Sequence, residues 1–380
     1  MIFYIIIFFL IVLFYLLSLG DDKKNMRLPF AIVMLCLSLF VGISDMLGGY
    51  DRYIYCELFD NAAETRLNNY PILSSLIFQE WPKEQLYCWF NIFLTYITQN
   101  RYIFILITTI IIFGLFYKAI KDYTDNYWFA LLLFMGLMFF FTFTYLRQML
   151  GVGVSIFALR FIYERKLFKF LLVVLIATLF HNSALILLPL YFIPLRKLTP
   201  SLIICIMILC LVIGLTSIPT TLFDTYGDVA QMEERAAGYV EDSGAFRFEY
   251  LLEVVFFLIL IFIRYDDIED DPKSISFLNM SFVFCAILLL FIRSLNGGRL
   301  AWYYIIGLIV TLTTLYGKRI DKSNVLIICV SLFLYLRILF AWNIFLYPYK
   351  TFFTNGHRDG DFIYNKYEYD QQYDKDKFYK

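Results

Sequence analysis

Long apolar stretches, separated by polar segments, run through most of the 380-residue chain. Most stretches have about 17 to 25 residues, enough for a helix rising about 1.5 Å per residue to cross about 30 Å of hydrocarbon. We therefore predict an all-α, polytopic integral membrane protein with about 10 to 12 transmembrane helices. The predicted spans are 2–19, 28–47, 102–117, 127–145, 148–163, 167–193, 202–218, 248–263, 275–292, 300–316 and 325–347.

Composition supports this class, because 61% of the residues are hydrophobic and only 17% are charged, outside the range of soluble globular domains. The first stretch begins at Ile2 with no basic residue before it, which favours a retained helix over a cleaved signal peptide. The sequence shows no internal repeat. Residues 1–349 are therefore predicted to form one transmembrane domain, and residues 350–380 a polar, partly disordered tail.

The distribution of lysine and arginine sets the expected orientation, because short cytoplasmic loops carry an excess of both. The loop residues are Lys23, Lys24, Arg27, Lys118, Lys121, Arg165, Lys166, Lys169, Lys318, Arg319 and Lys322. Placing them inside leaves both termini outside, together with two long segments, 48–100 and 219–247. Gln85 to Thr98 is too short to span and is expected to lie in the interface or to re-enter, a level that also suits Trp81.

The stretch 167–193 must then return to the inner face, so that Arg196 and Lys197 are also cytoplasmic. A helix break at His181-Asn182-Ser183 achieves this return. Broken helices are tolerated at membrane depth where their freed backbone packs against protein or lines a cavity. The alternative is one long tilted helix, which would place the later basic loops outside.

Several ionisable residues lie within or at the ends of the predicted spans, where charge costs roughly 2.5 kcal/mol or more. Counting about 1.5 Å per residue from the basic loops places Arg147, Arg293 and Arg299 at the outer boundary and His181 just beyond the midplane. Further candidates on the same side or inside the membrane are Gln148, Arg247, Glu249, Glu253 and Arg337. The outer segments add acids, among them Asp51 and Glu84.

Arginines above a membrane cavity suit phosphate or pyrophosphate, because the guanidinium group donates two parallel hydrogen bonds and keeps its charge. A base for an attacking hydroxyl could be His181, Glu253, Glu249 or Asp51. Simpler roles stay open: the arginines could be anchors at helix ends, His181 a packing residue, and the two glutamates partners of Arg247 or Arg337.

Small residues and cysteines admit structural explanations. Gly151 and Gly153 favour close helix packing over phosphate binding. Most of the seven cysteines lie in apolar spans, where they act as small hydrophobic residues, and only Cys56 and Cys88 could pair outside. The sequence contains no phosphate loop and no zinc-ligand spacing, and we expect neither a metal nor a cofactor.

The stretch from Thr142 to Ile193, expected to form a membrane-embedded hairpin, resembles the EpsG family of bacterial polysaccharide polymerases, which are related in function to the Wzy O-antigen polymerases. The resemblance lies in Leu146-Arg147-Gln148, then Glu164-Arg165-Lys166-Leu167, then Phe180-His181-Asn182-Ser183-Ala184. Weaker similarities are Asp51 with Tyr55 and Phe59, Glu84 with Tyr87, and Pro348-Tyr349-Lys350. About 50 residues carry it specifically, and Asn182 departs from the lysine or arginine usual after the histidine.

The resemblance implies a membrane glycosyltransferase fold of the C type, often metal-independent, acting at the outer face of the bacterial plasma (inner) membrane. Its substrate would be an oligosaccharide unit of an exopolysaccharide, capsule or O-antigen, linked to undecaprenyl pyrophosphate. Membrane lipid would surround the protein. By position, Arg147 would hold pyrophosphate beside Arg293 and Arg299, and His181 would act as base or orient the acceptor, with Asp51 as the alternative base. A chain-length regulator is a further candidate partner, and nothing indicates nucleic acid.

Two other functions fit the same features. A transporter or flippase for lipid-linked glycans would also use a cationic cavity, but such proteins normally show repeated halves. A membrane acyltransferase that modifies the polysaccharide would use a histidine to activate an acceptor hydroxyl.

Overall fold

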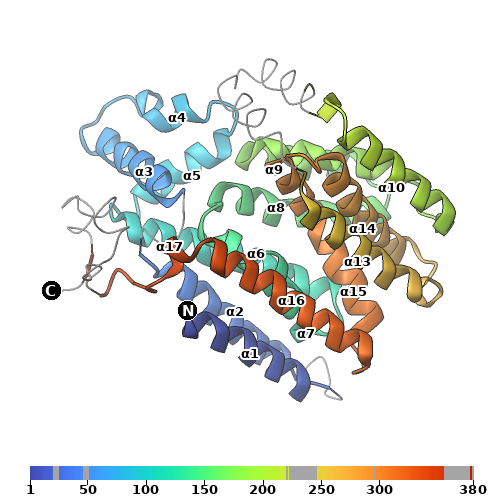
Figure 1. The fold of residues 1–380 in the computed structure, drawn as a ribbon. Coiled ribbons are helices and arrows are strands. Elements are labelled where there is room, and N and C mark those ends of the chain that lie inside the picture. Colours follow the sequence, from blue (N-terminus) through green and yellow to red (C-terminus); the bar gives the residue numbers. More distant parts are fainter. Residues whose placement is uncertain are drawn as a thin grey trace. The chain divides into compact units, whose positions relative to one another are not determined.

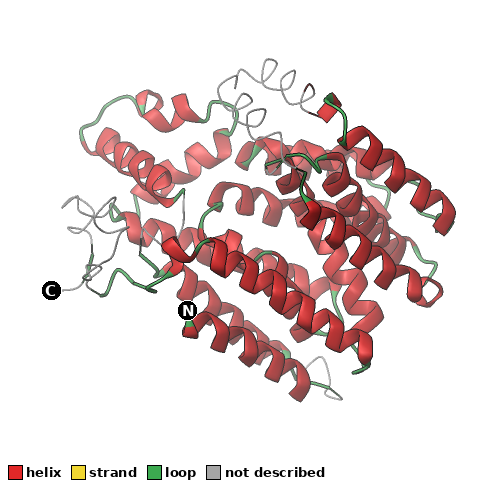
Figure 2. Ribbon diagram, in the orientation of Figure 1, coloured by secondary structure: helices red, strands yellow, loops and turns green. Residues whose placement is uncertain are grey.

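The computed structural model describes residues 1–19, 25–45, 51–219, 221, 246–294, 296–354 and 377–378. The regular elements of these residues are helices, which confirms the predicted class (Figure 2). Packing divides the chain into two compact units: unit 1 is Met1–Gly153, Ile176–Asn182 and Lys318–Lys380, and unit 2 is Val154–Leu175 and Ser183–Gly317. The single transmembrane domain stays a prediction.

Unit 1 contains most of the elements at both ends of the chain (Figure 1). These are α1 (Ile2–Leu17), α2 (Arg27–Gly42), α3 (Arg52–Leu67), η2 (Ile72–Ser74), α4 (Leu76–Glu80), α5 (Gln85–Thr95), α6 (Arg101–Tyr123), α7 (Tyr127–Leu137), η3 (Phe139–Phe143), α16 (Lys322–Ala341) and α17 (Asn343–Leu346). Helix α2 packs along α6, and α7 packs against both α1 and α16.

Unit 2 is built around α14, which contacts α10, α13, α15 and η6. Its elements are η4 (Asn182–Phe192, which starts one residue inside unit 1), α10 (Pro200–Gly214), α13 (Phe248–Ile263), η5 (Tyr265–Asp267), α14 (Pro272–Leu290), η6 (Gly297–Tyr304) and α15 (Ile305–Tyr316). Gly214 permits the contact between α10 and the end of α14, because a Cβ atom there would lie 2.0 Å from the Leu289 carbonyl oxygen. Helices α8 (Leu146–Tyr163) and α9 (Leu167–Phe180) contribute residues to both units.

The helices agree with the predicted apolar stretches. Five of those described are long and apolar enough to cross a membrane: Arg101–Tyr123, Leu146–Tyr163, Pro272–Leu290, Gly297–Tyr316 and Lys322–Ala341. Shorter apolar helices are Ile2–Leu17, Arg27–Gly42, Tyr127–Leu137, Leu167–Phe180, Asn182–Phe192 and Pro200–Gly214. These findings support a multi-pass membrane protein, and the number of crossings and their orientation stay predictions.

Polar residues at the ends of apolar stretches set where helices begin. The Asn100 side chain accepts hydrogen bonds from the N–H groups of residues 102 and 103 at the start of α6, and Asn126 caps α7 in the same way. Asp271 caps α14, and Asp321 forms a capping box with Asn324 at the start of α16. These caps satisfy N–H groups that the first turn of a helix leaves without partners.

Most of the predicted outer segment 48–100 forms a group of short helices, α3, α4 and α5, within unit 1 (Figure 1). Arg101 at the start of α6 pairs with Asp60 of α3 at 2.8 Å, and Phe59 stacks on Phe104 at 4.4 Å. Cys56 and Cys88 lie buried here as free thiols, so no disulfide joins them. The other predicted outer segment, 219–247, lies almost wholly outside the described residues.

A buried arginine ties this group to the neighbouring chain. Arg52, 1% exposed, donates to the carbonyl oxygens of Phe143, Ser44 and Val41 at 2.7, 2.8 and 2.7 Å. Burial lowers the pKa of Arg52 to about 10, so the side chain remains charged at neutral pH. Arg52 therefore clamps the ends of α2 and η3 onto the start of α3.

The chain breaks where the sequence predicts. Helix α9 ends at Phe180, His181 is not helical, and the 3₁₀ helix η4 follows from Asn182 to Phe192. At about 1.5 Å per residue α9 is about 21 Å long, and at about 2.0 Å per residue η4 is about 22 Å long. The end of η4 lies beside the α8–α9 turn, where the segment began, since the Arg165 guanidinium in that turn donates to the carbonyl oxygens of Tyr191 and Ile193.

Much of the predicted tail lies outside the described residues. Its first residues pack within unit 1 against the end of α2. The carbonyl oxygen of Lys350 accepts from the N–H of Asp45 at 3.0 Å, and Ser44 and Thr351 form an isolated antiparallel β-bridge. Near the chain end, the Lys377 ammonium group lies 2.9 Å from the Asp45 carboxylate, and both side chains are buried.

Candidate functional site

Arg147 lies in the first turn of α8, directly after η3, and its side chain is 13% exposed. Its Nη1 group donates to the carboxylate of Glu84, the residue before α5, whose side chain is 1% exposed. The guanidinium carbon lies 4.4 Å from the centre of the Trp81 ring, a cation–π contact. A carboxylate and an aromatic face therefore both hold Arg147.

Two tyrosines complete the surroundings of Arg147. The rings of Tyr55, Trp81 and Tyr87 lie 5.2 to 6.2 Å apart, centre to centre. Burial raises the pKa of Tyr55 well above its usual value, and the positive charge of Arg147 opposes that rise. Burial likewise raises the pKa of Tyr87. Both hydroxyls therefore stay protonated at neutral pH and can act only as neutral hydrogen-bonding groups.

The helix break reaches the same place. The backbone N–H of Asn182 donates to the second carboxylate oxygen of Glu84 at 3.0 Å, and the Phe180 ring lies 6.3 Å from that of Phe90 in α5. His181 is half-buried, and its own N–H closes α9 by donating to Ala177 at 2.9 Å. We name Tyr55, Trp81, Glu84, Tyr87, Arg147 and the Asn182 N–H group the Arg147 cluster.

Asp51 lies near this cluster. Its backbone N–H donates to the Thr144 hydroxyl at 2.8 Å, three residues before Arg147, and its carboxylate is among the charges that act on Tyr55. Gln148, the next residue of α8, is 5% exposed. The structure thus brings the predicted residues Arg147, Asp51 and His181 to one region of unit 1.

Two other predicted residues of unit 1 are Arg337 and Tyr349. Arg337 is half-buried in α16, five residues before Trp342, whose ring lies 6.2 Å from that of Tyr145. Tyr349 stacks on Phe40 at 4.3 Å and donates to the Phe40 carbonyl oxygen at 2.7 Å. Tyr349 therefore has a structural role in this arrangement.

The remaining predicted residues belong to unit 2. Arg293 follows α14, and the backbone N–H of Arg247 donates to the Ile292 carbonyl oxygen at 2.8 Å, so both arginines lie at one end of α14. Arg299 lies in η6, where its guanidinium group contacts the Asn296 side chain. Glu249 lies in the first turn of α13, and Glu253 one turn further, within electrostatic reach of Cys285 in α14.

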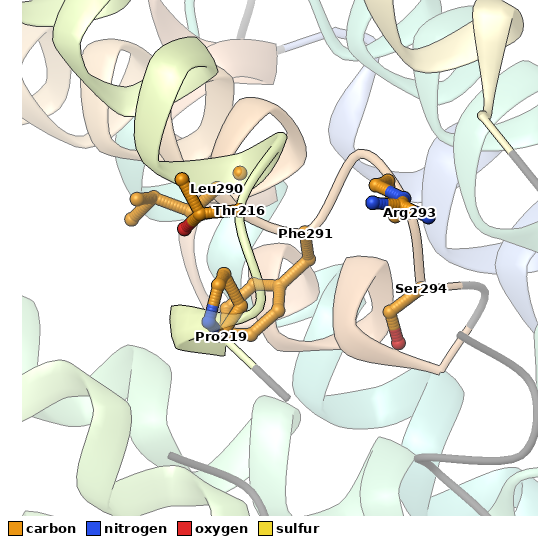
Figure 3. Close-up of a pocket in the computed structure, with 7 residues that line it drawn as sticks. Thr216, Pro219, Leu290, Phe291, Arg293 and Ser294 are labelled. Atoms are coloured by element: carbon orange, nitrogen blue, oxygen red, sulfur yellow. The ribbon is translucent and has the colours of Figure 1, made fainter. Parts of the chain in front are cut away.

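A shallow pocket adjoins this end of α14 (Figure 3). It is lined by Gly214, Thr216, Pro219, Leu290, Phe291, Arg293 and Ser294. The Arg293 side chain is exposed and donates to the Leu215 carbonyl oxygen at 3.3 Å. A cationic group beside apolar side chains matches the junction between a phosphate headgroup and a lipid chain.

Helix η4 contacts η6 within unit 2. The Ser183 hydroxyl donates to the Tyr303 hydroxyl at 3.0 Å, and the Tyr304 hydroxyl donates to the Ile186 carbonyl oxygen. Ser183 and Ile186 thus contact η6, the segment that carries Arg299.

Sequence reasoning gave Glu84 and Trp81 lesser roles. Glu84 counted only as one outer acid and as a weak family similarity, and Trp81 as an interfacial aromatic residue. A glutamate within an aromatic-rich segment, Trp81 to Phe93, was the available signal. The partners lie 63 and 98 residues from Glu84, so their pairing could not be read from spacing.

A family model for the EpsG family matches residues 27–351. The chain belongs to the EpsG family. Its members are polysaccharide polymerase-like membrane proteins, so this EpsG-family protein is a membrane protein of polysaccharide biosynthesis. The matched range includes the Arg147 cluster, the helix break and the arginines of unit 2. No curated protein and no solved structure matches the chain.

Proposed function

We propose that this EpsG-family protein is a polymerase that joins undecaprenyl-pyrophosphate-linked oligosaccharide units at the outer face of the bacterial inner membrane. The observation that carries the proposal is the Arg147 cluster beside the break at His181, within the family-matched range. An arginine with a mostly buried side chain, joined through Glu84 to the backbone beside a half-buried histidine, offers an anion-binding group and a proton acceptor in one region.

In this reaction the acceptor hydroxyl oxygen forms a bond to the anomeric carbon of the growing glycan. The bond from that carbon to the lipid pyrophosphate breaks, and the pyrophosphate leaves with the electron pair. Arg147, Arg293 and Arg299 are the candidates to stabilise the departing charge. The hydroxyl proton passes to a base, for which His181, Asp51 and Glu253 remain the alternatives.

The test uses purified protein in lipid vesicles with an undecaprenyl-pyrophosphate-linked repeat unit. We expect a ladder of lengthened glycans from the wild-type protein. Replacing Arg147 or His181 by alanine should reduce the ladder by at least about a hundredfold, while single units remain, because binding or proton transfer is lost. Gel separation of the labelled glycans measures both the lengthened glycans and the remaining single units.

Matched controls are available for both changes. R160A removes an exposed arginine from the same helix, one that pairs with Glu164, and H357A removes the other histidine of the chain. Both controls should form normal ladders. Undiminished polymer in R147A or H181A would remove that residue from the site. Transfer of unlengthened units across the vesicle membrane would indicate a flippase, and mass increments of acyl groups an acyltransferase.

A further inference from the structure

We propose that Glu84 is the positioning residue of the Arg147 cluster, which aims the Arg147 guanidinium at pyrophosphate and holds the backbone beside His181. The proposal rests on the polymerase function above. It concerns how one buried acid prepares the binding group, and Glu84 itself need not touch the substrate.

The burial of Glu84 requires a strong reason. A carboxylate with a side chain only 1% exposed loses its hydration, which is tolerated when charged or N–H partners replace the water. Glu84 has one such partner on each oxygen: Arg147 Nη1 on Oε2, and the Asn182 N–H on Oε1 at 3.0 Å. One side chain thereby joins the start of α8 to the end of α9.

Glu84 is itself rigidly placed. Its backbone N–H donates to the Trp81 carbonyl oxygen at 3.1 Å, and its own carbonyl oxygen accepts from Cys88 at 3.1 Å in the first turn of α5. The same short turn therefore supplies the carboxylate at the edge of the guanidinium group and the Trp81 ring on its face. Such two-sided contact fixes the plane of an arginine, as bidentate recognition of a phosphate group requires.

The ion pair also sets the affinity of the cluster for anions. Glu84 places a negative charge in direct contact with Arg147 and weakens its attraction for a second anion. Removing that charge should strengthen pyrophosphate binding, while removing the alignment should slow glycan transfer. Loss of folded protein cannot produce these opposite effects together.

The test compares E84Q with the wild-type protein in the ladder assay, with inorganic pyrophosphate as a competing anion. Glutamine keeps the shape and an acceptor for the Asn182 N–H group but loses the charge. We expect kcat to fall about tenfold or more and the inhibition constant of pyrophosphate to fall about threefold or more. E80Q, the same change at an exposed site in α4, should leave both constants unchanged.

A double-mutant cycle with R147K provides a second measurement. If Glu84 acts through Arg147, the loss in kcat for E84Q combined with R147K should be smaller than the product of the two single losses. E84D serves in place of E84Q if the latter does not insert. It keeps the charge on a shorter side chain, so kcat should fall while the pyrophosphate constant stays near the wild-type value.

The outcomes separate the two proposals. Wild-type protein that forms no ladder overturns the polymerase function, and this inference with it. A wild-type ladder with unchanged kcat in E84Q, or with an unchanged pyrophosphate constant, overturns the role of Glu84 alone.

Discussion

At the residue scale, two buried arginines of unit 1 show how partners decide a role. Arg52 donates to three backbone carbonyl oxygens, at the ends of α2 and η3, which makes it a structural clamp. Arg147 instead meets a carboxylate and an indole face. Carbonyl oxygens cannot be exchanged for a ligand without opening the backbone, whereas a side-chain ion pair can adjust when a second anion arrives.

We predict that R52M lowers stability without a specific effect on catalysis. Methionine fills the space but removes the donor of the Phe143 and Ser44 carbonyl oxygens, at a cost of about 1–3 kcal/mol each where no water replaces it, whereas the Val41 carbonyl oxygen still accepts from the Ser44 hydroxyl. The melting temperature of the purified protein should fall by several degrees.

R66M, on the same helix, is the matched control for R52M. Its guanidinium group lies over the exposed Tyr96 ring at 4.9 Å, a contact worth about 0.5–1 kcal/mol beside solvent. The control should therefore lower the melting temperature less. Equal melting temperatures for R52M and the wild-type protein would contradict the clamp.

At the element scale, the α8–α9 turn is tied to the end of η4 by hydrogen bonds. Arg165 has a φ of 52°, the left-handed conformation, and its side chain reaches the carbonyl oxygens of Tyr191 and Ile193. A residue of the family signature thus closes the returning segment onto its own starting point. This explains why an arginine occupies a position where glycine would be less strained.

We predict that R165A is less stable than R165G. Both variants lose the two hydrogen bonds, but alanine keeps the left-handed strain of about 1 kcal/mol that glycine relieves. Thermal unfolding should rank the wild-type protein first, then R165G, then R165A. An R165A protein as stable as R165G would show that the turn does not hold residue 165 in this conformation.

At the scale of the whole molecule, the proposed reaction requires Arg147 and Arg293 to lie on the same side of the membrane. The distribution of basic loops predicts this arrangement, since Arg165, Lys166 and Lys318 are expected in the cytoplasm. This common orientation is a property of the whole chain, because it depends on how many times the chain crosses the membrane between these residues.

Cysteine labelling tests this orientation in intact cells. In a variant whose seven native cysteines are replaced, N69C and R293C should react with a membrane-impermeant maleimide. K166C and K318C should react only after the membrane is opened. Labelling of N69C and R293C from opposite sides would exclude a shared outward site.

Many of the elements could be predicted, because membrane insertion depends on local composition. The break at His181 was predictable for a related reason. The basic residues before and after the stretch 167–193 are both expected in the cytoplasm, so the chain must return to the side from which it entered, and the polar His-Asn-Ser triplet interrupts the apolar stretch. The short helices α3 and α4 carry no apolar span and were not predicted as elements.

The sequence by itself therefore determined the membrane class, the order of the helices and the identity of the ionisable residues that need an explanation. Each follows from the free-energy cost of exposing backbone or charge to hydrocarbon, and this cost depends only on the local sequence of each segment. Only the tertiary structure decided that Glu84 lies between Arg147 and Asn182, that Trp81 covers the guanidinium group, and that Arg52 is a clamp. These pairings join distant segments, and packing in three dimensions selects one partner among many of the same charge.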